Sequence, residues 1–168
     1  MKTQKLTALI TGATSGIGKS FASKLAERGY DLILTGRRQE ELQKVTDYIV
    51  TTFGVNVETF IGDLSDAKCR KEISERIKSH GNIDFLVNNA GFGIDHSFYR
   101  IKLEDMRSMV MTHDMAALEF IHAVIPGMMN RRQGTIINVS SLGAFVPGFT
   151  RSLYLATKSF IHYFTKAL

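Results

Sequence analysis

The stretch Leu6–Gly18, LTALITGATSGIG, joins a short apolar strand to a glycine-rich loop. The strand is predicted over Leu6–Thr11, and a helix is predicted over Gly16–Arg28, where apolar residues recur at every fourth position until Gly29. Glycines let the backbone turn sharply, and the N-terminus of a helix offers free N–H groups and the positive end of its dipole to an anion. In this context the spacing G-x-x-x-G-x-G favours a diphosphate site, although the loop alone also fits a βα turn without a ligand.

Strand-like and helix-like segments alternate along the rest of the chain. The further predicted strands are Leu32–Thr35, Val55–Ile61, Phe85–Asn88 and Thr135–Ser140. The further predicted helices are Gln39–Phe53, a helix capped by Ser65 that ends at His80, Leu103–Ile125 with an interruption at Pro126, and a last helix from Ser152 onward. Nearly continuous apolar strands that alternate with helices predict an α/β fold with a doubly wound parallel sheet, Rossmann-like, in one domain over residues 1–168. In such a fold the site lies at the carboxyl ends of the strands.

The composition of the chain argues against several classes of protein. The chain has 168 residues, a net charge of +5 and a pI near 9.4. Its basic residues are mixed with glutamates on helical segments, as at Glu72 and Arg76, so we predict a solvated helix surface and no nucleic-acid partner. A single cysteine excludes an internal disulfide, and no apolar run approaches the length of a membrane span. We therefore expect a cytoplasmic protein with no membrane partner.

Two arginines follow the second predicted strand, where a dinucleotide-binding fold meets the adenosine ribose. An acidic residue there would bind the 2′-hydroxyl of NAD, whereas this chain has Arg37 and Arg38, and Asp31 lies before the strand. Arginine binds phosphate through planar, charge-assisted hydrogen bonds, so we predict NADP(H) rather than NAD(H). The alternative is a basic helix N-terminus exposed to solvent, which the helix dipole disfavours slightly. Asp63, after the third strand, fits either a contact with the adenine amino group or a cap of the next helix.

A serine, a tyrosine and a lysine form a second cluster. Ser141 follows the fifth predicted strand, and Tyr154 and Lys158 stand four positions apart on one face of the last predicted helix. A free tyrosine has a pKa of about 10, and a nearby ammonium lowers that pKa by favouring the phenolate. A serine hydroxyl could polarise the same carbonyl. The cluster therefore predicts an acid–base site for hydride chemistry, although tyrosine and lysine at this spacing also occur by chance.

Four motifs, in this order and at these separations, resemble the short-chain dehydrogenase/reductase family. They are T-G-x-x-x-G-I-G at Thr11–Gly18, N-N-A-G at Asn88–Gly91, the serine at Ser141, and Y-x-x-x-K at Tyr154–Lys158. The resemblance extends from the first strand to the last helix. It implies an NADPH-dependent oxidoreductase that interconverts a carbonyl and an alcohol on a small organic substrate. A catalytically silent NADP-binding or sensor protein is the alternative.

The resemblance also implies roles for single residues. Tyr154 would be the general acid or base, Lys158 would assist it and bind the nicotinamide ribose, and Ser141 would hold the substrate oxygen. The cofactor would contact the glycine loop, the segments after the third and fourth strands and the last helix, at Gly12, Ser15, Gly16, Ile17, Gly18, Asp63, Leu64, Asn89, Ala90, Gly91, Tyr154 and Lys158. No metal site is expected, because the histidines show no metal-ligand spacing. Cys69, in register with Ile73 and Ile77, is predicted to be a buried structural thiol.

His113 departs from the pattern of the family. Many members carry at this place an asparagine that holds a water molecule of a proton relay. A histidine can also give or take a proton near neutral pH. However, His113 continues an apolar stripe of its predicted helix, which includes Met109 and Ala117, and this fits a core histidine equally well. Both interpretations stay open at this point.

The sequence also predicts the oligomeric state and the completeness of the domain. Apolar residues surround the last predicted helix, and the family usually forms dimers or tetramers through the helices that correspond to Leu103–Ile125 and the helix from Ser152. We therefore predict a homodimer or homotetramer. Five strands are predicted here, whereas the sheet of such folds normally has six or more, and the chain stops within a helical pattern. We expect a C-terminally incomplete domain that lacks the last strands.

Overall fold

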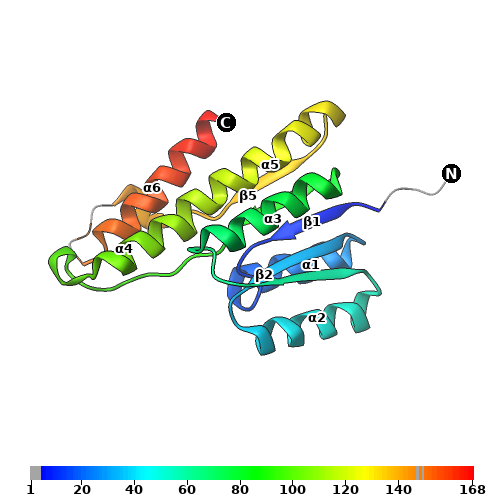
Figure 1. Cartoon of the computed structure of the whole chain (residues 1–168), viewed down its shortest axis with the longest axis horizontal. Coiled ribbons are helices and arrows are strands. Elements are labelled where there is room, and N and C mark those ends of the chain that lie inside the picture. Colours follow the sequence, from blue (N-terminus) through cyan, green and yellow to red (C-terminus); the bar gives the residue numbers. More distant parts are fainter. Residues whose placement is uncertain (1–4, 147, 149) are drawn as a thin grey trace.

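Five parallel strands form the centre of the fold. The computed structural model describes residues 5–146, 148 and 150–168. Its strands are β1 (Thr7–Ile10), β2 (Asp31–Gly36), β3 (Val57–Ile61), β4 (Phe85–Asn88) and β5 (Thr135–Asn138). Their order across the sheet is β3-β2-β1-β4-β5, so the winding reverses between β3 and β4 (Figure 1). This order confirms the predicted doubly wound, Rossmann-like fold.

Helices cover both faces of the sheet. The helices α1 (Gly16–Glu27) and α2 (Gln39–Phe53) lie on one face. The other face carries α3 (Ala67–His80), α4 (Leu103–Val110), α5 (Ala116–Arg131) and α6 (Ser152–Ala167) (Figure 1). Successive strand residues serve opposite faces, since Ala8 and Ile10 pack with α1 and α2 whereas Leu9 packs with α3 and α5. Strands buried on both faces explain the nearly continuous apolar runs in the sequence.

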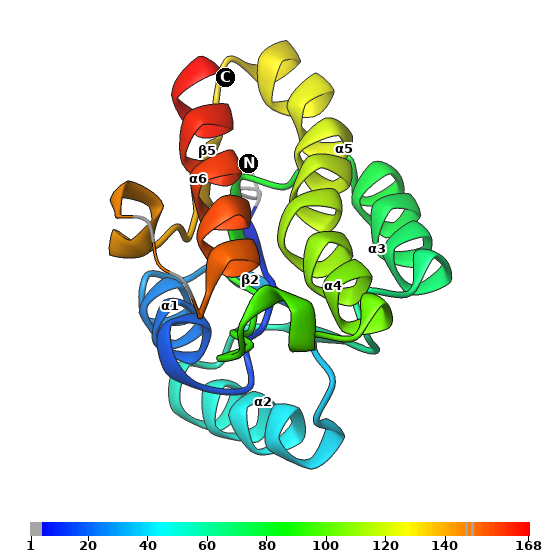
Figure 2. The same cartoon turned by 90° about the vertical axis from the view of Figure 1, so that its left-hand side faces the viewer.

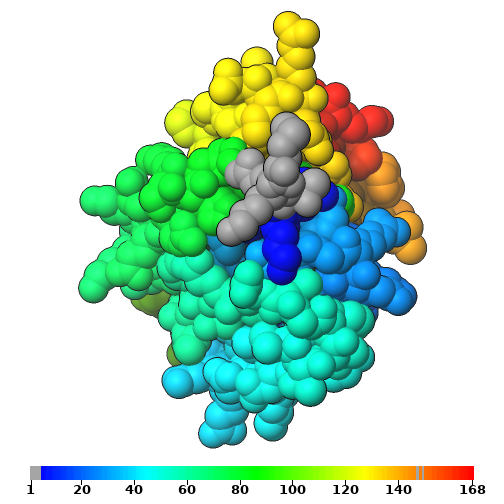
Figure 3. Space-filling view, turned by 90° about the vertical axis from the view of Figure 1, so that its right-hand side faces the viewer, coloured from blue at the N-terminus to red at the C-terminus, as the bar shows by residue number. Residues whose placement is uncertain are grey.

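The carboxyl ends of the strands meet at one end of the molecule, which faces the viewer in Figure 2. Figure 3 shows the opposite end, where the chain just before β1, in deep blue, reaches the surface. Backbone bonds continue the sheet pairing past the ends of the strands, because Thr11 N–H donates to Val87 O at 3.0 Å and Ala13 N–H donates to Thr35 O at 2.9 Å. The glycine loop is therefore anchored to its two neighbouring strands.

The cap of α3 is Asp66, so the prediction of Ser65 was wrong. The Asp66 side chain accepts a hydrogen bond from Lys68 N–H at 2.9 Å. Ser65 lies in the preceding turn, where its own N–H donates to Asp63 Oδ1 at 2.8 Å. The Asp63 side chain thus organises the turn, and the helix starts one residue later than the sequence suggested.

The predicted interruption at Pro126 was also wrong, since α5 runs through this proline to Arg131. A proline inside a helix removes one backbone hydrogen bond. Packing after the proline supports the helix, because Met128 is buried in the core. The Arg131 guanidinium also donates to the backbone carbonyls of Gly81 and Ile83 at 2.8 and 3.0 Å.

A π turn over Met111–Met115 (η2) joins α4 to α5 within what the sequence predicts as one helix. Single π turns of this kind often occur at functional sites. Three polar side chains of the turn, Thr112, His113 and Asp114, are buried. Two short 3₁₀ turns, Phe98–Arg100 and Leu142–Phe145, complete the structure.

Cys69 is half-buried rather than fully buried, while Ile73 and Ile77 lie in the core as predicted. Burial raises the pKa of the Cys69 thiol, so the sulfur stays protonated near neutral pH. Within the part of the chain that the structure describes, no helix combines the length and the apolar character that crossing a bilayer requires.

Candidate active site

The glycine loop forms an open cradle at the N-terminus of α1. Gly12 and Gly16 have φ angles of +69° and +55°, in the left-handed region that glycine tolerates best. The Ser15 side chain makes no capping bond to the helix, and the first turn of α1 contains no acidic residue. The N–H groups of this turn are therefore free of both a side-chain cap and a repelling charge, which suits a phosphate.

A threonine and an asparagine hold this loop against the segment after β4. Thr11 Oγ1 accepts hydrogen bonds from the N–H groups of Asn89 at 2.9 Å and Ala90 at 3.0 Å. In return, Asn89 Nδ2 donates to Thr11 O at 2.9 Å and to Gly12 O at 3.2 Å. Gly18 lies behind the loop, where a Cβ would overlap the Gly12 carbonyl. The loop and the N-N-A-G segment are thus one packed unit.

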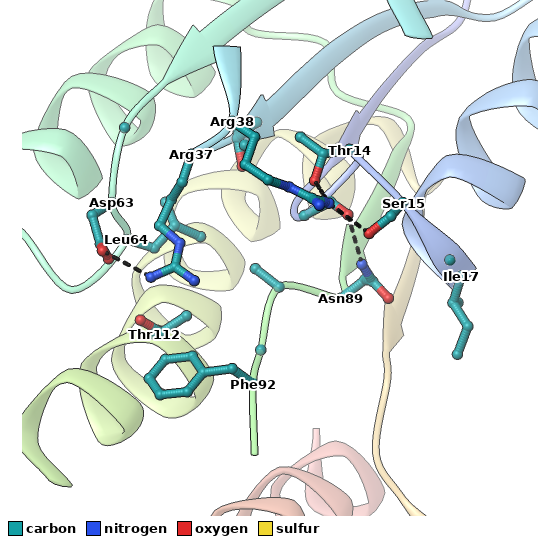
Figure 4. Close-up of a pocket in the computed structure, with 17 residues that line it drawn as sticks. Thr14, Ser15, Ile17, Arg37, Arg38, Asp63, Leu64, Asn89, Phe92 and Thr112 are labelled. Atoms are coloured by element: carbon teal, nitrogen blue, oxygen red, sulfur yellow. Dashed lines mark hydrogen bonds and ion pairs between the residues drawn. The ribbon is translucent and has the colours of Figure 1, made fainter. Parts of the chain in front are cut away.

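A cavity of about 490 Å³ opens in front of this unit (Figure 4). The predicted cofactor contacts that precede Tyr154 and Lys158 in the sequence line this cavity, apart from Gly18. They are Gly12, Ser15, Gly16, Ile17, Arg37, Arg38, Asp63, Leu64, Asn89, Ala90 and Gly91. Its wall also contains residues that sequence reasoning missed: Thr14, Thr35, Gly36, Gly62, Phe92 and Thr112. Most of these extend the loop or the strand ends, and could have been found from the predicted topology. Thr112 belongs to the π turn, for which the sequence carries no signal.

The two arginines reach into the cavity from the end of β2 (Figure 4). Arg38 Nη2 donates to Thr14 Oγ1 and to Ser15 Oγ, both at 2.8 Å. Arg37 Nη1 lies 3.2 Å from Asp63 Oδ2, and its guanidinium carbon lies 5.6 Å from the centre of the Phe92 ring. Burial alone would raise the pKa of Asp63, but hydrogen bonds from Ser65 and Arg37 hold it below its usual range. Asp63 therefore lines the cavity as an anion rather than capping α3.

A second cavity of about 420 Å³ holds the tyrosine and the lysine. The two cavities adjoin, and they are together called the cleft below, because they share four lining residues: Ile17, Asn89, Gly91 and Phe92. Lys158 Nζ lies 5.9 Å from the centre of the Tyr154 ring and donates to Val139 O at 2.8 Å. Burial lowers the pKa of Lys158, and the nearby Asp114 opposes this effect. The cleft thus joins the glycine loop to the predicted acid–base pair.

Ser140, rather than Ser141, is among the residues that line this second cavity. Ser140 Oγ donates to the Lys158 carbonyl at 2.8 Å and ties the end of β5 to α6. Ser141 Oγ accepts a hydrogen bond from Gly143 N–H at 3.1 Å and caps the 3₁₀ turn that follows. The role of Ser141 toward a substrate oxygen stays a prediction.

His113 is 5% exposed and contacts the wall of the cleft from the π turn. Its Nε2 accepts a hydrogen bond from Phe92 N–H at 2.9 Å, and its Nδ1 lies 2.9 Å from Thr157 Oγ1. Burial lowers the pKa of His113 to about 4, and the positive charge of Lys158 acts in the same direction. The histidine is therefore neutral near pH 7, with both ring nitrogens engaged.

The cleft fits a dinucleotide that carries phosphate groups. The glycine cradle can accept a diphosphate, and Arg37 and Arg38 can bind a further phosphate. Thr35 and Thr112 line the same cavity, and their buried hydroxyl oxygens have no hydrogen-bond partner among the described residues. Among the residues that the structure describes, no three or more histidine, cysteine, aspartate or glutamate side chains lie together where they could hold a metal ion.

The chain is similar in sequence and in fold to known proteins. The family model described as short chain dehydrogenase matches residues 6–168. The very-long-chain 3-oxoacyl-CoA reductase of Anas platyrhynchos is 34% identical over an alignment of 168 positions, which covers 96% of this chain and 53% of that protein. The short-chain dehydrogenase from Sphingobium yanoikuyae in complex with NADPH matches with a TM-score of 0.93 at 32% identity, over 97% of this chain and 64% of that one.

The bulky-bulky ketone specific alcohol dehydrogenase from Comamonas testosteroni matches with a TM-score of 0.95 at 30% identity, over 99% of this chain and 67% of that one. The chain spans about half the length of the vertebrate relatives that it matches; for the Anas protein the share is 53%. The fold, the order of the motifs and the family match agree, and the chain belongs to the short-chain dehydrogenase/reductase family.

Proposed function

We propose that the protein is an NADPH-dependent oxidoreductase that interconverts a carbonyl and an alcohol on a small organic substrate. One observation carries the proposal: a single cleft has phosphate-binding groups at one end and the Tyr154–Lys158 pair at the other. Residues that bind a dinucleotide and residues that handle a proton thus share one cavity. A bound nicotinamide cofactor would supply the hydride, and the protein would supply orientation and the proton.

The preference for NADP(H) over NAD(H) is supported by Arg37 and Arg38. Both guanidinium groups line the cavity, and no acidic residue stands at the end of β2 to bind a ribose 2′-hydroxyl. The ion pair with Asp63 and the bonds to Thr14 and Ser15 hold the two arginines at the rim. NADPH and NADP also occur in the structures of several relatives, including the Sphingobium enzyme.

Tyr154 is the proposed proton donor in the direction of carbonyl reduction. As the carbonyl carbon gains a hydride, its oxygen gains the Tyr154 proton, and the products are an alcohol and a phenolate. The Lys158 ammonium lies on the same helix face and stabilises the phenolate by its charge. Ser141 is proposed to hold the substrate oxygen, and the lining residue Ser140 offers a second hydroxyl nearby.

A homo-oligomeric state in the cytoplasm completes the proposal. An apolar groove of about 640 Å³ runs between α3, α5 and α6, and it is lined by Leu118, Ile121, Ile125 and Phe164 among others. A second copy of the protein could bury this surface, as the resemblance to oligomeric relatives predicts. Light scattering tests this part of the proposal, and a monomer at micromolar concentration would contradict it.

The proposal is tested with the full chain, NADPH and a panel of ketones and aldehydes, followed through cofactor absorbance. We expect substrate-dependent oxidation of NADPH, and slower or absent oxidation of NADH. Tight NADPH binding without turnover on any carbonyl or alcohol would instead support the alternative, a silent NADP-binding or sensor protein. Absence of binding to either cofactor would contradict both functions.

A further inference from the structure

The π turn places His113 between two segments that both border the cleft. On one side lies the segment after β4, whose Phe92 N–H donates to His113 Nε2 at 2.9 Å. On the other side lies α6, where Thr157 Oγ1 is 2.9 Å from His113 Nδ1. Thr157 stands three residues after Tyr154 on the same helix. The imidazole ring therefore bridges the cofactor side and the tyrosine side of the cleft.

The hydrogen-bond directions determine the tautomer. Because Phe92 N–H can only donate, His113 Nε2 must be an acceptor and carry no proton. In a neutral ring the proton then lies on Nδ1, which donates to Thr157 Oγ1. Thr157 Oγ1 donates its own proton to the Tyr154 carbonyl at 2.8 Å. The four groups thus form a chain with one direction, from Phe92 through the ring to the turn that carries Tyr154.

The surroundings keep the ring in place and neutral. The rings of Phe92 and Tyr154 pack against it edge to face, with centroids 5.6 and 5.8 Å away. A Cβ at Gly91 would come within 3.0 Å of His113 Nε2, so the backbone after β4 lies directly on the ring. The ionisable groups that face the ring are Tyr154 and Lys158 of α6, and Asp114 follows His113 in the turn. The segment after β4 presents only the uncharged Gly91 and Phe92.

We propose that His113 is a positioning residue, held as the neutral Nδ1–H tautomer, which fixes the Tyr154 turn of α6 to the segment after β4 and itself transfers no proton. Its effect on turnover rests on the proposed function, whereas its tautomer and its bridging contacts do not. The proposal differs from a relay role, in which the ring would have to release or accept a proton during each cycle. Both ring nitrogens are already engaged with protein partners, so such a transfer would break one of the two bonds.

The first test needs no catalysis. The histidine ring nitrogens of the full chain are followed by nitrogen-15 NMR between pH 5 and 8, and His113 is assigned by comparison with His113→Asn. We expect a ring protonated at Nδ1 alone over the whole range. An Nε2–H tautomer, or protonation of His113 near the ordinary histidine pKa of about 6.5, would overturn the proposal. This result stands even if no substrate is ever found.

The second test separates the two bridging contacts. Asn at position 113 places an amide near the site of Nδ1 and can donate to Thr157, whereas Gln reaches the site of Nε2 and can accept from Phe92 N–H. We expect His113→Ala to lower kcat on the order of 10-fold to 100-fold, since small displacements of a reacting group are enough for such losses. The Kd for NADPH should change less than kcat, and the Asn and Gln variants should each recover part of kcat.

The pH–rate profile distinguishes positioning from relay. For a positioning residue, His113→Asn and His113→Gln keep the shape of the wild-type profile and change only its height. Loss of one ionisation from the profile, or wild-type turnover in His113→Ala, would overturn the proposal. His80→Gln, at the last residue of α3 and outside both cavities of the cleft, is the matched control and should leave kcat and the profile unchanged. If His113→Ala does not fold, the Asn and Gln variants still decide between the two roles.

Discussion

At the scale of single residues, the two arginines after β2 have different partners. Arg38 is bound to the glycine loop through Thr14 and Ser15, whereas Arg37 extends across the cavity to Asp63 and Phe92. Exposed ion pairs such as Arg37–Asp63 contribute little to stability. Arg37 can therefore exchange its carboxylate partner for a ligand phosphate at small cost in free energy, which makes it the residue best suited to bind the 2′-phosphate of the proposed cofactor.

Replacing Arg37 by aspartate should reverse the cofactor preference. We expect the variant Arg37→Asp to bind NADPH roughly 10-fold to 100-fold more weakly, as a charge-assisted bond of about 1.5–3 kcal/mol is lost and repulsion is added. Binding of NADH should stay the same or improve. Fluorescence titration of both cofactors measures the change, and Lys68→Asp on α3 is a control with the same change of charge. An unaltered ratio of the two dissociation constants would contradict the assignment of Arg37.

Asp114 destabilises the fold in a pH-dependent manner. Burial raises its pKa to about 7, although Lys158 acts against this shift, and its Oδ1 has no hydrogen-bond partner among the described residues. The unfolded chain ionises this group above its ordinary pKa of 3.8, so the unfolded state binds fewer protons between about pH 4 and pH 7. The contribution of Asp114 to the free energy of unfolding therefore becomes more unfavourable as the pH rises through this window.

The variant Asp114→Asn should be more stable than the wild type, by on the order of 1 kcal/mol at pH 8. The gain should shrink as the pH falls toward 4 and disappear below about pH 3, where Asp114 is neutral in both states. Thermal unfolding of both proteins at pH 5 and pH 8 measures the difference, and the pH dependence of other groups cancels in this comparison. Asp47→Asn, at an exposed position of α2, should show no such trend. A gain that is equal at both pH values would contradict the role of the buried charge.

At the scale of elements, the sequence predicts regular segments well and local irregularities poorly. The glycine loop and the N-N-A-G segment could be predicted from their residue types. Glycine tolerates the positive φ angles of the loop, and the Asn89 side chain donates to backbone carbonyls. The π turn at Met111–Met115 could not be predicted, because its apolar pattern continues that of an α-helix. The contacts of its His113 are with residues distant in sequence, Phe92 after β4 and Thr157 on α6. The wrong cap at Ser65 has a similar origin, since two candidate caps are adjacent and only the turn around Asp63 selects Asp66.

Gly18 lies where α1 packs against the glycine loop, so a substitution at this position tests that packing. A Cβ at this position would overlap the Gly12 carbonyl and crowd Asn89 Nδ2, and the backbone atom cannot move aside without opening the loop. We expect Gly18→Ala to lower the free energy of unfolding by about 1–3 kcal/mol, the usual range for overpacking, and to weaken NADPH binding. Ser20→Ala, at an exposed position of the same helix, should change stability by less than about 0.5 kcal/mol. Equal stability of the two variants would show that the loop packs differently.

At the scale of the whole molecule, the sheet order brings residues far apart in sequence to one end of the strands. The crossing between β3 and β4 puts the glycine loop beside the N-N-A-G segment, and β5 then brings α6 to the same cleft. This much could be predicted from alternating strands and helices. That Ser140 rather than Ser141 lines the cavity could not be predicted, because it depends on how the chain turns after β5.

In the proposed function, one cleft both binds NADPH and supplies the proton for carbonyl reduction through Tyr154. The most direct measurement compares turnover and NADPH binding for the wild type and for Tyr154→Phe, which removes only the phenolic hydroxyl. We predict that kcat falls by roughly 10²-fold to 10⁴-fold, the range typical of general acid catalysis, while the Kd for NADPH stays nearly the same. Undiminished turnover in Tyr154→Phe would contradict the claim.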